Sequence, residues 1–288
     1  MKKARKKIII GIIIALTIIF LFQLNKTIKS QININVITRF STTTHSLSEV
    51  NKYDLQPGLN IIPIDLGGPI DSDRANGAYG DSALLEQNGN YLLMDTGTDD
   101  ANDVLINFLK SQEVNKLSIY ISHYHNDHYA KIKDILRDSY FTVENVYLPN
   151  PNIISSKLDE SASWYNEINE YVTIAENLKN DLIGLGTNVV LIEKGSKINL
   201  GDAKIDVIWD LTESSLTPNE YYQDSYGSLK NHFMNDTSLI TKVSYKGIKF
   251  LNAGDIEARA EEEIIEKNVD VKADIFKCSH HGGASSNI

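Results

Sequence analysis

The sequence predicts an α/β fold in which mixed sheets pack between helices. Short apolar runs typical of strands alternate along most of the chain with longer segments of helical periodicity. Two of the short runs are joined by Asn88-Gly89-Asn90 and two others by Lys246-Gly247, and both turns are typical of antiparallel hairpins. Because hairpins and helix-separated strands occur in one chain, we expect layers of sheets and helices and not a purely parallel sheet.

The expected strands share a run of apolar and β-branched residues bounded by polar or turn residues. They cover residues 60–65, 83–87, 91–95, 117–122, 143–148, 189–193, 205–209, 238–244, 248–252 and 273–276. The expected helices share apolar positions at helical spacing, and they cover residues 101–111, 129–137, 162–183 and 256–267. The polar stretch 211–232 interrupts this pattern, and we expect a surface insertion that borders the functional site.

The composition indicates a globular domain with an acidic body. The 288 residues are 42% hydrophobic and 23% charged, which suits one large domain or two small ones and excludes a disordered chain. Five of the 28 basic residues lie in the first 25 positions, so the remainder has a net charge of −15. This charge repels phosphate backbones and disfavours nucleic acid as a partner, unless metal ions reverse the local field. The single cysteine, Cys278, excludes an internal disulfide and a cysteine-rich zinc module.

Residues 1–25 have the pattern of a membrane signal anchor. Five basic residues precede an apolar run over residues 8–24, which is near the lower length limit for a transmembrane helix. The positive-inside rule then places the remainder outside the cell. No small-residue cleavage site follows, so we expect an uncleaved single-pass helix in the cell membrane; the alternative, cleavage, would give a secreted protein. We expect residues 26–59 to be a tether and residues 60–288 to be the extracellular domain.

A cluster of histidines forms the strongest chemical motif. Five of the seven histidines fall in two groups, and the first group is His123-Tyr124-His125-Asn126-Asp127-His128, directly after an apolar strand. Residues two apart in an extended segment face the same side, so His123 and His125 are expected to hold one metal ion. As the chain turns into the next helix, Asp127 and His128 are directed towards a second ion. Imidazole and carboxylate suit Zn²⁺, with Mn²⁺ or Fe²⁺ as alternatives, and the structural alternative is a polar surface turn.

This motif resembles that of the metallo-beta-lactamase superfamily. The resemblance implies a four-layer αβ/βα sandwich with one or two metal ions at the edges of its sheets. It also implies that Asp95, in Asp95-Thr96-Gly97, supports the metal loop, and that Asp255, in Gly254-Asp255, bridges both ions. In the second histidine group His281 is the implied ligand and His280 lines the site, although the reverse order stays open.

Some features narrow the resemblance and others depart from it. Gly80-Asp81-Ser82-Ala83, Asn235-x-x-Ser238 and the His-His-Gly triplet resemble a branch that includes competence DNA-uptake hydrolase domains and phosphorylcholine esterases.

Tyr129-Ala130 stands where the superfamily often has Gly-Gly. A further histidine usually completes the first metal site, and His232 is the candidate here; without it that ion has His123, His125, Asp255 and water. The chain stops directly after the last motif, so we expect C-terminal elements of the fold to be missing.

These features predict a membrane-anchored, extracytoplasmic metal-dependent hydrolase. Asp255 is expected to bridge two zinc ions that hold a hydroxide for attack on a phosphodiester, with Asp127 orienting the water. The expected substrate is a small-molecule or cell-surface phosphoester. The alternatives are a non-catalytic or truncated metal-binding surface protein and a competence-type extracellular nuclease, and the sequence leaves the oligomeric state open.

Overall fold

The computed structural model describes residues 34–36, 52–66, 80–98, 103–221, 229–283 and 285–287. The membrane helix expected within residues 1–25 lies outside these ranges. Among the helices within them, none has the length and apolar character needed to cross a membrane.

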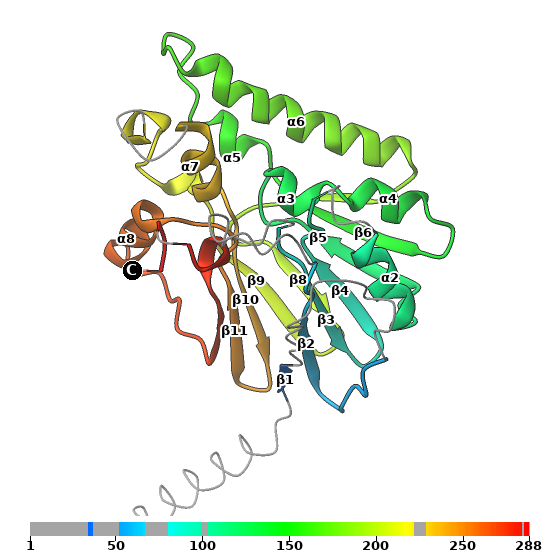
Figure 1. Ribbon diagram of the computed structural model, residues 1–288. Helices are drawn as coiled ribbons and strands as arrows, with labels where there is room; N and C mark the ends of the chain where they lie inside the picture. Colours follow the sequence, from blue (N-terminus) through cyan, green and yellow to red (C-terminus); the bar gives the residue numbers. More distant parts are fainter. Residues whose placement is uncertain are drawn as a thin grey trace, which may run out of the picture.

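Two mixed sheets form the centre of the fold (Figure 1). The larger sheet has the strand order β1-β2-β3-β4-β5-β6-β7, and its strands are Ile34–Val36, Leu59–Pro63, Ala83–Gln87, Asn90–Met94, Lys116–Tyr120, Thr142–Pro149 and Val189–Ile192. The smaller sheet has the order β12-β11-β10-β9-β8, and its strands are Ile275–Lys277, Ile248–Asn252, Ile240–Tyr245, Ala203–Trp209 and Lys197–Leu200.

Both sheets combine antiparallel and parallel pairing. Strands β2, β3 and β4 pair antiparallel, whereas β4 to β7 pair parallel. Both expected hairpins are present, and their central residues have positive φ: 52° at Asn88 and 76° at Gly89, then 47° at Lys246 and 88° at Gly247. Tight hairpin turns require this conformation because its twist matches that of the flanking strands. The predicted mixed-sheet α/β fold is therefore confirmed.

Helices lie on the outer sides of the two sheets. Figure 1 shows α2 (Val104–Ser111) and α4 (Ile132–Arg137) beside the larger sheet and α8 (Ala258–Glu266) beside the smaller sheet on the opposite side. The long helix α6 (Tyr165–Gly184) ends just before Gly186, whose φ of 82° is the left-handed conformation that stops a helix. The resulting order of helix, sheet, sheet and helix agrees with the expected αβ/βα sandwich.

Two apolar clusters hold these layers together. Ile119 of the larger sheet and Val243 of the smaller sheet are buried in the same cluster, which joins the sheets. A second cluster contains Trp209 and Leu251 of the smaller sheet and Ile264 of α8, so it packs this helix onto the sheet. Burial of apolar side chains is the main stabilising contribution to such layers.

The helix expected over residues 129–137 is in fact two short helices. The first, α3 (Asn126–Tyr129), begins directly after His125, and the second is α4. As a result, Asp127 and His128 lie within a single helical turn that follows the extended segment. Because the chain changes direction sharply here, the side chain of His128 faces a different point from that of His123.

The stretch 211–232 is not simply a surface insertion. It contains two short 3₁₀ helices, Leu211–Glu213 and Pro218–Tyr221, and the start of α7 (Leu229–Asp236). Leu211 and Tyr221 are buried in the main core. The expected surface insertion is therefore in part integrated into the core of the domain.

Other short elements also lie outside the expected ones. They are β8, α5 (Asn152–Ser155), the 3₁₀ helix Ser279–Gly282 and β1, which pairs parallel with β2. Strand β1 falls within the segment assigned to a tether, as does Tyr53, whose ring packs against the core. Part of residues 26–59 thus contributes to the folded domain.

Candidate metal centre

The loops that carry the predicted site residues meet at one end of the two sheets. Asp95 follows β4 and the first histidine group follows β5, and these strands are parallel neighbours. Asp255 follows β11 and His281 follows β12, which are also parallel neighbours. Because the carboxyl ends of parallel strands share one edge of a sheet, each sheet delivers two of these loops to the same region.

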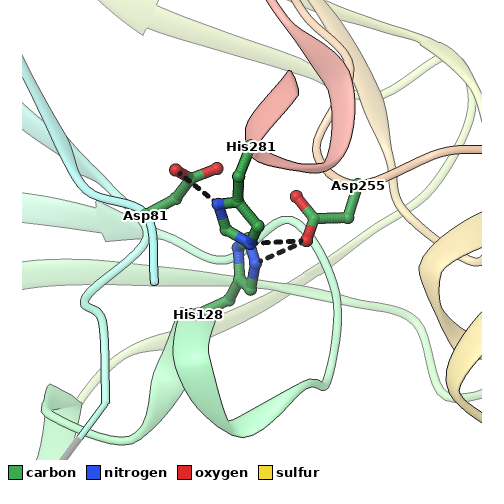
Figure 2. A group of neighbouring side chains, drawn as sticks. All are labelled: Asp81, His128, Asp255 and His281. Atoms are coloured by element: carbon green, nitrogen blue, oxygen red, sulfur yellow. Dashed lines mark hydrogen bonds and ion pairs between the residues drawn. The ribbon is translucent and has the colours of Figure 1, made fainter. Parts of the chain in front are cut away.

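Four side chains converge at this end of the fold: Asp81, His128, Asp255 and His281 (Figure 2). Each offers one potential ligand atom, and these atoms lie within 4.8 Å of one another. Nε2 of His128 lies 3.0 Å from Oδ2 of Asp255, and Nε2 of His281 lies 3.1 Å from the same oxygen. The structure thus brings together three predicted ligands from distant parts of the sequence. That they bind a metal ion stays a prediction.

Asp127 faces the same point. Its Oδ2 lies 3.4 Å from Nε2 of His281 and 3.8 Å from Nε2 of His128. The carboxylate therefore points at the two imidazole nitrogens that also face Asp255. Asp127 and Asp255 thus offer potential oxygen ligands beside two potential nitrogen ligands, a combination typical of divalent transition-metal sites.

Asp81 was not among the predicted site residues. Its Oδ1 lies 3.0 Å from Nδ1 of His281, and its Oδ2 forms an ion pair with Nζ of Lys277. The contact with Oδ1 of Asp81 occupies Nδ1 of His281, so Nε2 of His281 faces Asp255. Asp81 therefore lies where a carboxylate can orient an imidazole, and it is also one of the four side chains that offer a potential ligand atom.

Asp95 orients His128 in the same way. Its Oδ2 lies 2.9 Å from Nδ1 of His128, and its Oδ1 accepts a hydrogen bond of 2.7 Å from the backbone N–H of Ser122. Asp95 is 2% exposed, so this contact is shielded from water. The geometry agrees with the supporting role predicted for Asp95, because the contact fixes which imidazole nitrogen faces Asp255.

His123 and His125 lie next to this cluster, with 4.8 Å between their ring centroids. The Nε2 atoms of both are buried and have no hydrogen-bond partner, and the same holds for Oδ1 of Asp255. Buried polar atoms in proteins almost always have a partner, so three such atoms beside the cluster fit a bound cation. Neither histidine belongs to the group whose ligand atoms lie within 4.8 Å of one another, and their role as ligands stays a prediction.

The two remaining candidates, His232 and His280, both contact Glu257. Nδ1 of His232 lies 2.6 Å from one carboxylate oxygen of Glu257, and Nδ1 of His280 lies 3.2 Å from the other. Glu257 is 6% exposed, and no local sequence pattern predicts its contacts with these two histidines. Of the histidine pair, it is therefore His281 that lies in the cluster, while His280 turns towards Glu257.

Burial determines the charge of His123 and His125. It lowers the pKa of His123 well below the usual value, and the neighbouring His128 and His125 lower it further. It lowers the pKa of His125 to about 4. Both imidazoles are therefore neutral near pH 7, which is the form that binds metal ions.

The carboxylates determine the charge of His128 and His281. Burial by itself lowers the pKa of His128, but the charges of Asp255 and Asp95 outweigh this effect and raise it well above the usual value. Burial also disfavours charge on His281, but its bonds to Asp127 and Asp255 raise its pKa to about 12. These positive charges balance the carboxylates, and a divalent cation at the same point would displace both protons.

Comparison with known proteins connects this geometry to a family. The model of the family described as "Anti-Pycsar protein Apyc1" matches residues 71–241, which is more than half of the chain. Among curated proteins, none matches.

This chain is also similar to solved structures described as metallo-beta-lactamases or as proteins of that fold. The protein YhfI from Bacillus subtilis is 11% identical, with a TM-score of 0.36, over 67% of this chain and 61% of YhfI. A metallo-beta-lactamase superfamily protein from Sulfolobus tokodaii is 13% identical, with a TM-score of 0.40, over 77% of this chain and 79% of its own. The chain thus spans about three fifths of the length of YhfI.

Proposed function

The chain belongs to the Anti-Pycsar protein Apyc1 family and has a metallo-beta-lactamase-like fold, and on this premise we propose that it is a metal-dependent hydrolase of a phosphodiester. The observation that supports this most directly is the convergence of His128, His281 and Asp255, with both Nε2 atoms within 3.1 Å of one carboxylate oxygen. Asp127 and two orienting carboxylates complete this arrangement. Such a convergence of imidazoles and carboxylates is typical of a metal centre. A polar surface turn, the structural alternative, would not need these side chains to converge.

The protein side chains act by placing charges and proton acceptors around a bound phosphoryl group. Two divalent ions at such a centre supply Lewis acidity and lower the pKa of bound water. Asp255, placed between the two histidine groups, holds negative charge at the centre of the site. Asp127, which is partly exposed, lies where it can accept a hydrogen bond from an attacking water. Asp81 and Asp95 keep His281 and His128 in the orientation that ligation needs.

The proposed substrate is a small phosphodiester. The resemblance to phosphoesterase branches favours a phosphoester, and the acidic body of the chain disfavours a polyanionic polymer more strongly than a singly charged diester. The matched family is described as an anti-Pycsar protein, and we carry this over as the biological setting: the chain acts against Pycsar. Zinc is the proposed metal, with manganese and iron as alternatives.

We also propose that the chain is anchored in the membrane. The basic and apolar pattern of residues 1–25 supports a single-pass helix with the domain outside the cell. Protease digestion of intact cells that express the full chain tests this placement. Cleavage of the domain without lysis is the expected result, and protection until lysis contradicts it.

The hydrolase proposal is tested with the purified full chain loaded with zinc. We expect cleavage of bis-p-nitrophenyl phosphate, and comparison with cyclic mononucleotides, dinucleotides and DNA then shows the preferred class. Activity should be lost in His125→Ala and Asp255→Ala and kept in Asp159→Ala, which changes an exposed turn. Folded, zinc-loaded protein that cleaves none of these diesters indicates a binding protein instead, whereas DNA cleavage that weakens steeply with salt indicates the nuclease alternative.

A further inference from the structure

Three of the four histidines at the candidate metal centre have a polar side chain at Nδ1. The three contacts join Ser122 to His123 at 3.1 Å, Asp95 to His128 at 2.9 Å and Asp81 to His281 at 3.0 Å. Such a contact fixes the orientation of an imidazole and directs its Nε2 towards a metal ion. The fourth histidine, His125, has aromatic rings as neighbours instead.

The ring of His125 packs against two other rings. Its centroid lies 4.8 Å from that of His123, at an interplanar angle of 73°, and 5.7 Å from that of Tyr171, at an angle of 69°. Both pairs are edge-to-face, an arrangement that aromatic rings prefer because the positive edge of one ring meets the negative face of the other. Rotation of the His125 ring changes both angles, so its two neighbours together restrict its orientation.

Tyr171 is held in place by the packing of α6. This helix buries Ile168, Ala175 and Leu178, and Tyr171 is itself partly buried against the same core. Positions 168, 171, 175 and 178 are three or four residues apart, so they share one face of the helix. Movement of the Tyr171 ring away from His125 would therefore disturb the packing of α6.

His125 stands at a point where such support is needed. It is the last residue before α3, and its backbone is extended, with a ψ of 143°. Its side chain is partly exposed, whereas His123 and His128 are fully buried. The Nε2 atom of His125 is nevertheless buried and has no hydrogen-bond partner, so it is the atom of this ring that a cation would meet.

We propose that Tyr171 is a positioning residue of the metal centre, whose ring holds the imidazole of His125 in the orientation in which Nε2 meets the ion. This inference rests on the proposed metal centre. The ring of Tyr171 and not its hydroxyl group makes this contribution, because the contact joins the two rings. An edge-to-face pair changes a binding equilibrium by about two- to tenfold. The ion beside His128 and His281, whose imidazoles are held by carboxylates, should keep its affinity.

Titration of the full chain with zinc and with cobalt tests the proposal. For Tyr171→Leu we expect one of two classes of ion to bind about two- to tenfold more weakly, and the visible absorption spectrum of bound Co²⁺ to change, because His125 is less well oriented. Tyr171→Phe keeps the ring and should behave as wild type. The matched control is Leu182→Ala, since Leu182 is buried on the same face of α6 about three turns away. This variant should have a lower melting temperature but unchanged metal affinities and an unchanged spectrum.

Wild-type affinities and a wild-type spectrum in Tyr171→Leu overturn the proposal, and so does an equal loss in Tyr171→Phe or in Leu182→Ala.

A crystal structure of zinc-loaded wild type gives an answer that does not depend on how the variants fold. We expect an ion at Nε2 of His125, with the ring of Tyr171 still edge-to-face against the imidazole. A His125 ring that binds the ion but has turned away from Tyr171 overturns this inference and leaves the proposed function intact. Absence of zinc from the whole centre contradicts the proposed function itself, so the two failures are distinguishable.

Discussion

Oδ2 of Asp95 lies 2.9 Å from Nδ1 of His128, and both side chains are buried. The contact joins the end of β4 to helix α3, and it turns Nε2 of His128 towards Asp255. The same carboxylate binds the backbone and hydroxyl of Ser122, so it organises the start of the histidine motif as well. A residue without direct access to the substrate therefore controls the geometry of the centre.

The first prediction concerns this contact. Asp95→Asn removes the negative charge next to His128 and keeps the shape of the side chain, so we expect zinc affinity to fall by about 10- to 100-fold without loss of the fold. Competition with a chromophoric chelator measures the affinity. Asp159→Asn, on an exposed turn, is the control, and an affinity for Asp95→Asn equal to that of this control contradicts the proposed role.

The second prediction concerns Gly80, whose φ is 78°. A Cβ at this position would lie 1.8 Å from the backbone oxygen of Asp127, because the two loops are in close contact. We expect Gly80→Ala to displace the metal-binding turn and to reduce both zinc affinity and thermal stability. Gly89→Ala is a matched control, since Gly89 has a φ of 76° and a Cβ there meets no atom within 4 Å.

Both alanine variants experience the same left-handed strain, about 1–2 kcal/mol. The difference between them isolates the contact with Asp127. Calorimetric melting and zinc titration of both variants measure this difference, and equal losses in the two would show that the contact is unimportant.

The third prediction concerns the buried Asp236. Burial raises its pKa to about 8, although hydrogen bonds from Tyr221 and from the backbone N–H of Glu257 act in the opposite direction. The unfolded carboxyl titrates near pH 4, so the folded state holds an extra proton between about pH 4 and 8. The contribution of Asp236 to the free energy of unfolding therefore falls as the pH rises from about 4 to 8.

Asp236→Asn removes this titration. Relative to wild type, the variant should become more stable as the pH is raised from about 5 to 8.5, as measured by urea unfolding in a chelator-containing buffer. Asp202→Asn, on an exposed turn, should follow wild type. A constant stability difference between Asp236→Asn and wild type across this range contradicts the raised pKa.

The fourth prediction concerns removal of metal. Asp127 and Asp255 face one point, so a bound cation stabilises the folded chain, by about 4 kcal/mol when its concentration is a thousand times the dissociation constant. A chelator should therefore lower the melting temperature of wild type. The same treatment should have little effect on Asp255→Ala, and equal shifts in the two proteins contradict the assignment of Asp255.

Local sequence signals were sufficient for much of the fold. The hairpin turns at Asn88 and Lys246 were recognisable because positive φ favours Asn and Gly, and the histidine motif followed a strand with clear apolar character. By contrast, β8 is four residues long and half exposed, and α7 is mostly polar. Their formation depends on packing against the core, which local patterns do not reveal.

The site was predictable only in part, for a similar reason. The spacing of the first histidine group shows which residues share a strand or a turn, whereas the partner of each second imidazole nitrogen depends on tertiary contacts. The contacts of Asp81 and Glu257 with the histidines could therefore not be predicted, although Gly80-Asp81 forms part of a recognisable motif. His232 was a reasonable candidate by residue type, but the structure pairs it with Glu257.

The central claim is that His128, Asp255 and His281 hold a divalent cation together. Elemental analysis of the full chain after zinc loading and gel filtration tests this most directly. We expect about two equivalents of zinc in wild type and about one fewer in His281→Ala, with wild-type content in Asp159→Ala. Folded wild-type protein that retains no zinc, or a His281→Ala variant that retains as much as wild type, would contradict it.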